Sequence, residues 1–119
     1  MIVLYNNKVL DIFSGKSPRV WGMAIFPFIL VREDLRGSSE ARYTINHEMI
    51  HIRQQAELLL VFFMLWYYIP YLARRFRGYS PSQAYMMSRF EKEAYANMYD
   101  LRYLNRRRPF SFLKKSCLR

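Results

Sequence analysis

The stretch "TINHEMIHIRQQAELLLVFFMLWYYIP", from Thr44 to Pro70, runs from a polar beginning into an apolar block. Residues 45–69 contain neither proline nor glycine, so we expect a helix that begins near Ile45 with Thr44 as its N-cap. Pro70 should end or kink this helix, because proline lacks the amide hydrogen that a helix interior uses. The stretch therefore predicts one long helix with two chemically different halves.

The pentapeptide HEMIH within this helix has the HExxH pattern of helical zinc sites. Positions i and i+4 lie on one helix face, so His47 and His51, the chain's two histidines, can chelate one ion. Glu48 lies beside them, and its carboxylate can take a proton from an attacking water and pass it to a leaving group. Gln54, one turn beyond His51, can line the site or hydrogen-bond a ligand. Ordinary surface residues on a helix are the alternative interpretation.

A zinc hydrolase needs three protein ligands and one open position, so a carboxylate must complete this site. The stretch "SRFEKEAYANMYD" (88–100) offers Glu91 and Glu93 on a second predicted helix. On a helical wheel Glu91 lies about 70° from the centre of the apolar stripe, and Glu93 lies about 90° away on the other flank. Burial favours Glu91 as the third ligand, with Glu93 as the alternative. Both can also be exposed and paired with nearby basic side chains.

HEMIH followed about forty residues later by Glu-x-x-Ala resembles the gluzincin branch of HExxH zinc metallopeptidases, minigluzincins included. The two motifs also resemble a group of small uncharacterised bacterial proteins with HExxH and FExEAY. The gluzincin resemblance implies a zincin-like fold, a Zn²⁺ cofactor and a polar residue after the third ligand that orients a histidine. Asn97 has that place in the frame that begins at Glu93, whereas Tyr95 has it in the frame that begins at Glu91.

The N-terminal part is predicted to be β-rich. Ile2–Tyr5 and roughly Val9–Phe13 have strand composition, with a turn at NNK between them. Residues 22–32 form an apolar run whose central Pro27 confines it to a sheet edge. The resemblance implies an edge strand that pairs with an extended peptide beside the site helix, and residues 23–32 have that position. An ordinary core strand is the alternative.

A polar loop, "EDLRGSSEAR" (33–42), separates this part from the first helix. The second helix is predicted from Gln83 to Leu104, with Ser82 as its cap. Together these elements predict one α+β zincin-like domain over residues 1–104, with short N-terminal strands, an edge strand and then two long helices. Residues 105–119 are predicted to be a basic C-terminal tail.

The apolar block, residues 58–73, has sixteen residues without a charge. As a helix it is about 24 Å long, which is shorter than the roughly 30 Å hydrocarbon layer of a membrane. A crossing would also put the histidines and the candidate carboxylates on opposite sides, although zinc–ligand bonds are only about 2 Å long. We therefore expect the block to pack in the core or to dip into one leaflet; a full span conflicts with the zinc site.

The net charge of +10 is concentrated near the end of the chain, where residues 102–119 hold seven Lys or Arg and no acid. Such runs attract anionic membrane surfaces or simply keep a protein soluble. Nucleic acid is disfavoured as a partner, because the chain has no recognisable binding motif. The single Cys117 excludes a disulfide framework. The N-terminus lacks a signal peptide, which predicts a location in the cytoplasm or at the cytoplasmic face of the membrane.

These observations predict a zinc-dependent metallopeptidase that acts on a peptide or protein substrate. In it, Glu48 is the general base that activates water for attack on the peptide carbonyl. Two alternatives remain: a membrane-associated protein without catalysis, and a zinc-binding structural or regulatory module that has no activity.

Overall fold

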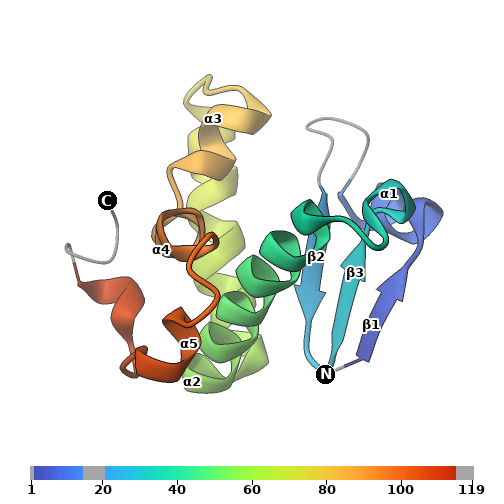
Figure 1. Ribbon diagram of the computed structural model, residues 1–119. Coiled ribbons are helices and arrows are strands. Elements are labelled where there is room, and N and C mark those ends of the chain that lie inside the picture. The colour runs from blue at the N-terminus through green and yellow to red at the C-terminus, as the bar shows by residue number, and fades with distance from the viewer. Residues whose placement is uncertain (1, 15–20, 115–119) are drawn as a thin grey trace.

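The computed structural model describes residues 2–14 and 21–114. The fold is α+β: a small sheet lies beside a group of helices, and the first part of the long helix α2 lies between them (Figure 1). The α+β class predicted from the sequence is therefore confirmed. Several of the predicted element boundaries are wrong, as the individual elements show.

The first strand, β1 (Ile2–Tyr5), has the predicted bounds and pairs in parallel with β3 (Phe28–Val31). The second predicted strand, Val9–Phe13, is wrong: this segment lies in helix α1 (Asn7–Ser14). Asn6 caps that helix, because its Oδ1 accepts a hydrogen bond from the Val9 amide at 3.1 Å. Leu10 of this helix is fully buried in the described structure. A capped amphipathic helix therefore stands where a strand was predicted.

Residues 22–32 form a hairpin and not the single strand that was predicted. Strand β2 (Gly22–Ile25) turns at Phe26 and Pro27 and pairs antiparallel with β3, so the sheet order is β1-β3-β2. The turn falls at Pro27 because proline has no amide hydrogen to continue a ladder. Within the described residues β1 and β2 each pair on one side only, so both are edge strands, and β2 is the edge strand that lies against α2.

Helix α2 (Ser39–Phe76) begins earlier than predicted, after the short 3-10 turn η1 (Glu33–Leu35). Ser38 is the N-cap, since its side chain accepts a hydrogen bond from the Ala41 amide at 3.2 Å. Thr44 was wrongly predicted to be the cap; it lies inside the helix and is buried. The serine side chain satisfies a free amide at the helix start, so the helix extends back to it.

The interruption of α2 falls at Leu59, whose backbone dihedrals (φ 60°, ψ 148°) are not helical. Pro70 was predicted to end or kink the helix; it does not end it, because the helix continues through it to Phe76. We call residues 39–58 the site segment and residues 60–76 the apolar segment. The chain turns back between them, so the apolar segment runs up toward α3 in Figure 1. Phe63, which is 4% exposed, anchors it against the other helices.

The single second helix predicted over residues 83–104 is also wrong. Three short helices replace it: α3 (Pro81–Met86), α4 (Arg89–Asn97) and α5 (Tyr103–Arg106). The 3-10 turn η2 (Ser111–Leu113) follows them. Ser80 forms a capping box at the start of α3, where Ser82 was expected to be the cap. Buried Asn46 of α2 donates to the carbonyl oxygens of Met98 and Asp100, at 2.8 and 3.0 Å. These bonds satisfy carbonyls beyond the last turn of α4, so the helix ends there.

Three apolar clusters hold these layers together. Ile29, Val31 and Ile52 join the sheet to the site segment, while Ile50, Ala94 and Tyr103 join that segment to α4 and α5. The third cluster contains Phe63, Phe90 and Phe112, and it joins the apolar segment to α4 and η2. Phe112 and the side chain of Arg107 are buried, so this described part of the stretch predicted as a tail packs onto the domain.

Candidate metal centre

The HEMIH motif lies on the site segment, between the sheet and α4. His47 and His51 are buried, at 4% and 5% exposure, and their Nε2 atoms lie 3.2 Å apart. Their i, i+4 spacing places the two rings on one face of the helix, as the sequence predicts, with the ring planes 72° apart. Ile50 and Ile52, on either side of His51, pack into two different clusters and fix the rotation of the helix.

Glu91, in the first turn of α4, completes a three-residue group with the histidines. Its Oε1 lies 3.0 Å from each histidine Nε2, and one ligand atom from each of the three residues lies within 4.8 Å of the others. Glu91 is only 3% exposed. Burial by itself raises the pKa of Glu91, but the two imidazoles outweigh it and hold that pKa well below its usual range. Burial lowers the pKa of His51, and Glu91 outweighs that effect and raises it to about 9.

The arrangement of these atoms fits a metal ion. Ligand atoms about 2.0–2.1 Å from a tetrahedral ion lie about 3.3 Å from one another, close to the distances observed here. Two imidazole nitrogens and one carboxylate oxygen form a common ligand set for divalent transition metals. The buried cluster of His47, His51 and Glu91, which we call the metal group, can therefore hold a metal ion.

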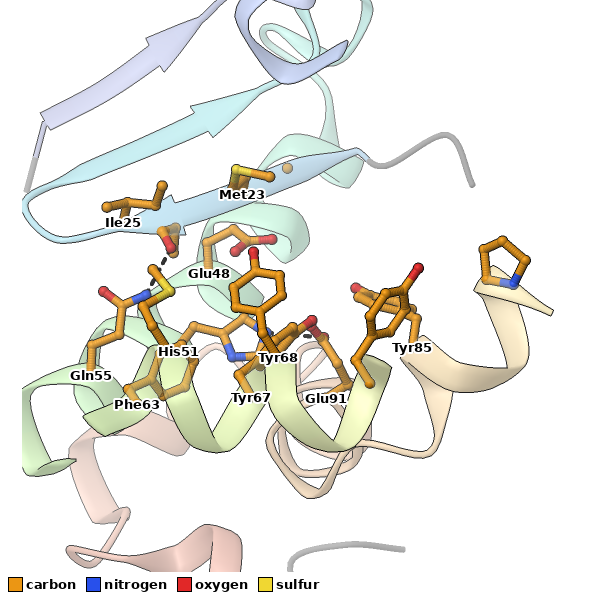
Figure 2. A pocket seen from close by; sticks show the side chains of 15 residues that line it. Met23, Ile25, Glu48, His51, Gln55, Phe63, Tyr67, Tyr68, Tyr85 and Glu91 are labelled. Atoms are coloured by element: carbon orange, nitrogen blue, oxygen red, sulfur yellow. Dashed lines mark hydrogen bonds and ion pairs between the residues drawn. The ribbon is translucent and has the colours of Figure 1, made fainter. Parts of the chain in front are cut away.

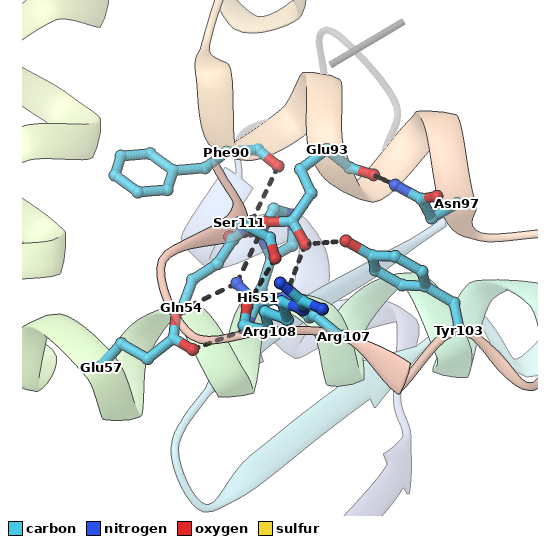
Figure 3. A network of polar contacts seen from close by, with 10 residues as sticks. All are labelled: His51, Gln54, Glu57, Phe90, Glu93, Asn97, Tyr103, Arg107, Arg108 and Ser111. Carbon is cyan, nitrogen blue, oxygen red and sulfur yellow. Dashed lines mark hydrogen bonds and ion pairs between the residues drawn. The ribbon is translucent and has the colours of Figure 1, made fainter. Parts of the chain in front are cut away.

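The second candidate ligand, Glu93, lies in a different environment and does not meet the histidine nitrogens. It is fully buried, and its carboxylate accepts hydrogen bonds from Tyr103 Oη at 2.7 Å and from Arg107 Nε at 2.6 Å (Figure 3). Arg107 also forms two hydrogen bonds with Glu57, at 2.6 and 3.0 Å. A carboxylate already held by an arginine and a tyrosine supports the fold, and it has no lone pair directed at the metal group.

Gln54 connects this network to the metal group. Its Oε1 lies 2.7 Å from His51 Nδ1, and its Nε2 donates to Glu93 Oε1 at 2.9 Å and to the Phe90 carbonyl at 3.2 Å (Figure 3). Because its amide nitrogen is a donor to two oxygens, its oxygen is left to accept the proton of His51 Nδ1. When His51 loses a proton to bind a metal, its Nε2 is therefore the nitrogen that carries the lone pair.

Asn97 does not occupy the orienting position that the resemblance implied. Its amide donates to the Glu93 carbonyl at 2.8 Å, one turn back on its own helix. His47 Nδ1 is buried and has no hydrogen-bond partner within the described residues. The ring of Tyr95 packs edge-on against His47 with centroids 4.4 Å apart, so ring packing orients this histidine.

Tyr67, on the apolar segment, is a site residue that the sequence analysis missed. Its hydroxyl donates a hydrogen bond to Oε2 of Glu91, the oxygen that faces away from the histidines. Burial and the charge of Glu91 raise the pKa of Tyr67 well above its usual value, so the hydroxyl keeps its proton. Phe63 and Tyr67 share a face at i, i+4 spacing, but only the reversal at Leu59 brings that face to the motif.

Glu48 differs from the other buried acids because none of the described residues donates a hydrogen bond to its carboxylate. It is 5% exposed, and burial raises its pKa above the ordinary value for a glutamate. Figure 2 shows it between β2 and His51. Burying an unpaired carboxylate is costly, so a fold keeps such a group where chemistry requires it more readily than for stability.

A cavity of about 260 Å³ opens beside Glu48, His51 and Glu91 (Figure 2). The edge strand forms one wall, and aromatic side chains from the apolar segment and from α3 form the other: Phe63, Tyr67, Tyr68, Tyr71 and Tyr85. Gly22 lets the strand approach the helix here, because a Cβ at that position would lie 2.8 Å from Thr44 Cγ2 and 3.2 Å from Glu48 Cγ. A peptide-sized group can therefore reach Glu48 from the strand side.

Gln55, next to Gln54, holds the edge strand to the site segment. Its Nε2 donates to the Ala24 carbonyl at 2.7 Å, and its Oε1 accepts from the Phe26 amide at 2.9 Å. These backbone groups lie on the free edge of β2. Backbone groups of an antiparallel strand alternate between its two sides, so those of Gly22 face the same edge as those of Ala24.

Comparison of the chain with protein-family models, with curated proteins and with solved structures found no match.

Proposed function

We propose that this chain is a zinc-dependent metallopeptidase of the zincin-like type, with Zn²⁺ held by His47, His51 and Glu91. The observation that carries the proposal is the convergence of three buried ligand atoms, 3.0–3.2 Å apart, beside the buried carboxylate of Glu48, to which none of the described residues donates a hydrogen bond. Two imidazoles and one carboxylate are the ligands of a well-known class of catalytic zinc sites, which keep a fourth position open.

The bound ion would act as a Lewis acid that polarises the substrate carbonyl and makes water a better nucleophile at neutral pH. Glu91 presents one oxygen to both histidines, while Tyr67 binds its other oxygen and holds the carboxylate in that orientation. Gln54 and Glu93 fix the His51 tautomer from behind.

Glu48 is the general base in this proposal. Its carboxylate takes the proton from the attacking water and returns it to the amine that leaves when the peptide bond breaks. A raised pKa suits both steps, because the group accepts a proton more readily and remains an effective acid afterwards. A purely structural metal site would have no use for a buried unpaired acid at this position.

The edge strand supports a peptide as substrate. An extended chain can add to the free edge of β2 near Gly22, next to Glu48 and the cavity. Gln55 already occupies the edge at Ala24 and Phe26, so strand pairing is confined to the end of β2 nearest Glu48. The apolar and aromatic lining favours a hydrophobic substrate side chain in the cavity.

Metal analysis of the purified chain tests the ligand set. We expect one equivalent of zinc in the wild type and loss of most of it in His47→Ala and Glu91→Ala. The matched control is Glu48→Gln, which removes an acid from the same site and leaves the three ligands intact. If Glu91→Ala kept its metal, Glu91 would not be one of the ligands.

Hydrolysis of a peptide library by wild type and Glu48→Gln tests the reaction. We expect cleavage that depends on zinc and falls by about 10²-fold or more in the variant, which keeps its metal. If the chain binds zinc but shows no cleavage that depends on Glu48, the result favours the alternative of a zinc-binding structural or regulatory module without activity. If the purified chain holds no metal, the result favours the alternative of a membrane-associated protein without catalysis.

A further inference from the structure

The outer side of the apolar segment is an exposed hydrophobic stripe. Its side chains lie 50–92% exposed and fall within about 100° of one another on a helical wheel: Val61, Phe62, Leu65, Ile69, Leu72 and Phe76. Phe63 and Tyr67 point the other way, toward the core and the metal group. From Val61 to Phe76, a span of sixteen residues, the stripe is about 22 Å long. A continuous apolar strip of this length on a small protein marks an interaction surface.

The sequence around the stripe is basic and lacks acidic residues. Between Glu57 and Glu91 the chain has no acidic residue, and a basic cluster of Arg74, Arg75 and Arg77 lies at the C-terminal end of the stripe. Glu57 is held by Arg107, and Glu91 belongs to the metal group, so neither compensates these arginines. The whole chain has a net charge of +10. Such a surface attracts an anionic layer and repels a second copy of itself.

Aromatic side chains lie along the margins of the stripe. Trp66 and Tyr68 are 40% and 45% exposed, and the guanidinium of Arg89 lies 5.6 Å from the Trp66 ring centroid. Tryptophan and tyrosine favour the boundary between lipid headgroups and acyl chains. Tyr68 also lines the cavity beside Glu48, so the cavity opens next to the stripe.

We propose that the stripe docks into one leaflet of an anionic lipid bilayer, with the helix axis along the membrane surface and the basic cluster against the headgroups. Helix α2 is long and apolar enough by composition to cross a membrane, and 6% of its most apolar window is buried in the protein. A crossing would pull Tyr67 away from Glu91, whereas surface docking buries the stripe and leaves that hydrogen bond intact. This inference does not rest on the proposed peptidase function.

Flotation of the full chain with lipid vesicles tests the docking. We expect binding to vesicles of phosphatidylcholine with phosphatidylglycerol and much weaker binding to phosphatidylcholine alone. Leu65→Gln with Ile69→Gln should lower the partition coefficient by about tenfold or more, because it removes two apolar groups from the buried strip. The matched control, Ile12→Gln with Leu101→Gln, changes exposed apolar residues elsewhere and should bind like the wild type.

A second stripe variant, Val61→Gln with Leu72→Gln, covers the case in which the first variant fails to fold, which circular dichroism reports. Metal content of the same samples reports on the metal centre separately. The proposal is overturned if the wild type stays free of both vesicle types, or if both folded stripe variants bind as well as the wild type. It is also overturned if light scattering shows a wild-type dimer that the stripe variants dissociate, because the occupant is then a second copy.

Discussion

The two segments of α2 relate polarity to burial in opposite ways. The site segment carries the polar side chains and buries them, while the apolar segment carries the hydrophobic side chains and exposes most of them. In the described structure Phe63 is the one buried residue of the apolar segment. The site segment buries these polar residues: Thr44, Asn46, His47, Glu48, His51, Gln54 and Gln55.

This difference shows that the burial of α2 follows the available partners. Asn46 and Gln55 each satisfy backbone groups of another element, and Gln54 connects a histidine to a glutamate. Such hydrogen bonds offset the cost of removing polar groups from water. The apolar segment covers the metal group with one face, and its other face remains available for a surface outside the chain.

The largest effect that we expect concerns the charges that support the site segment. Arg107→Met should lower the free energy of unfolding by about 3–5 kcal/mol, because it leaves Glu93 and Glu57 without their buried partner. Chemical denaturation measures this change. Arg106→Met is the matched control, since Arg106 is exposed and pairs with Asp100 at the surface, and its unfolding midpoint should not move. Equal effects in the two variants would contradict the role of Arg107.

The second effect is the pH dependence of the metal-free protein. The folded pKa of His51 is about 9, above its unfolded value of 6.5, so its contribution to stability is full below pH 6.5 and is lost as pH rises toward 9. The pKa of Glu91 is depressed, so its contribution is full above pH 4.5 and is lost at lower pH. Unfolding after chelation should therefore show maximum stability between pH 4.5 and 6.5.

Between pH 6.5 and 9 the metal-free protein should lose on the order of 2–3 kcal/mol. The zinc-loaded protein should lose less over the same range, because metal binding requires deprotonated histidines and improves as protons leave. Metal-free stability that rises between pH 6.5 and 9 would contradict the buried ion pair.

The third comparison uses the adjacent glutamines of the site segment. Gln54→Leu should weaken zinc binding by about 10–100-fold, because it removes the acceptor that fixes the His51 tautomer. Gln55→Leu should leave zinc affinity unchanged and lower the free energy of unfolding by about 1–3 kcal/mol, because Gln55 binds β2 and not a histidine. Competition with a chromogenic chelator measures the affinities. If both variants bound zinc equally well, Gln54 would have no orienting role.

The smallest effect lies at the junction of the two segments. Leu59 has φ 60° with ψ 148°, a conformation that costs a residue other than glycine on the order of 1–3 kcal/mol. Leu59→Gly should therefore raise the thermal midpoint, with a net gain of about 1 kcal/mol after the greater unfolded-state entropy of glycine. Leu59→Ala keeps the strained dihedral and should give no gain. If the Gly variant were no more stable than the Ala variant, Leu59 would not be the residue with the strained conformation.

Much of the metal group could be predicted from the sequence. The i, i+4 spacing of His47 and His51 fixes their common face in any helix, and the lack of further histidines directs the search to Glu91 and Glu93. The choice between these two glutamates depends on the break between α3 and α4 and on the end of α4 at Asn97, where Asn46 of α2 binds the next carbonyl oxygen. Those features come from contacts distant in sequence, which a helical wheel does not contain.

By itself the sequence determined the α+β class, the first strand, the histidine pair and the chemical division of α2 into two halves, because these follow from local spacing and composition. Only the tertiary structure decided the reversal at Leu59, the approach of Tyr67 to Glu91 and the pairing of Arg107 with Glu93 and Glu57. The two pairings join residues far apart in the chain, and the reversal at Leu59 is what brings Tyr67 to Glu91. Their energies depend on which groups are desolvated together, and that is settled by packing and not by the order of residues.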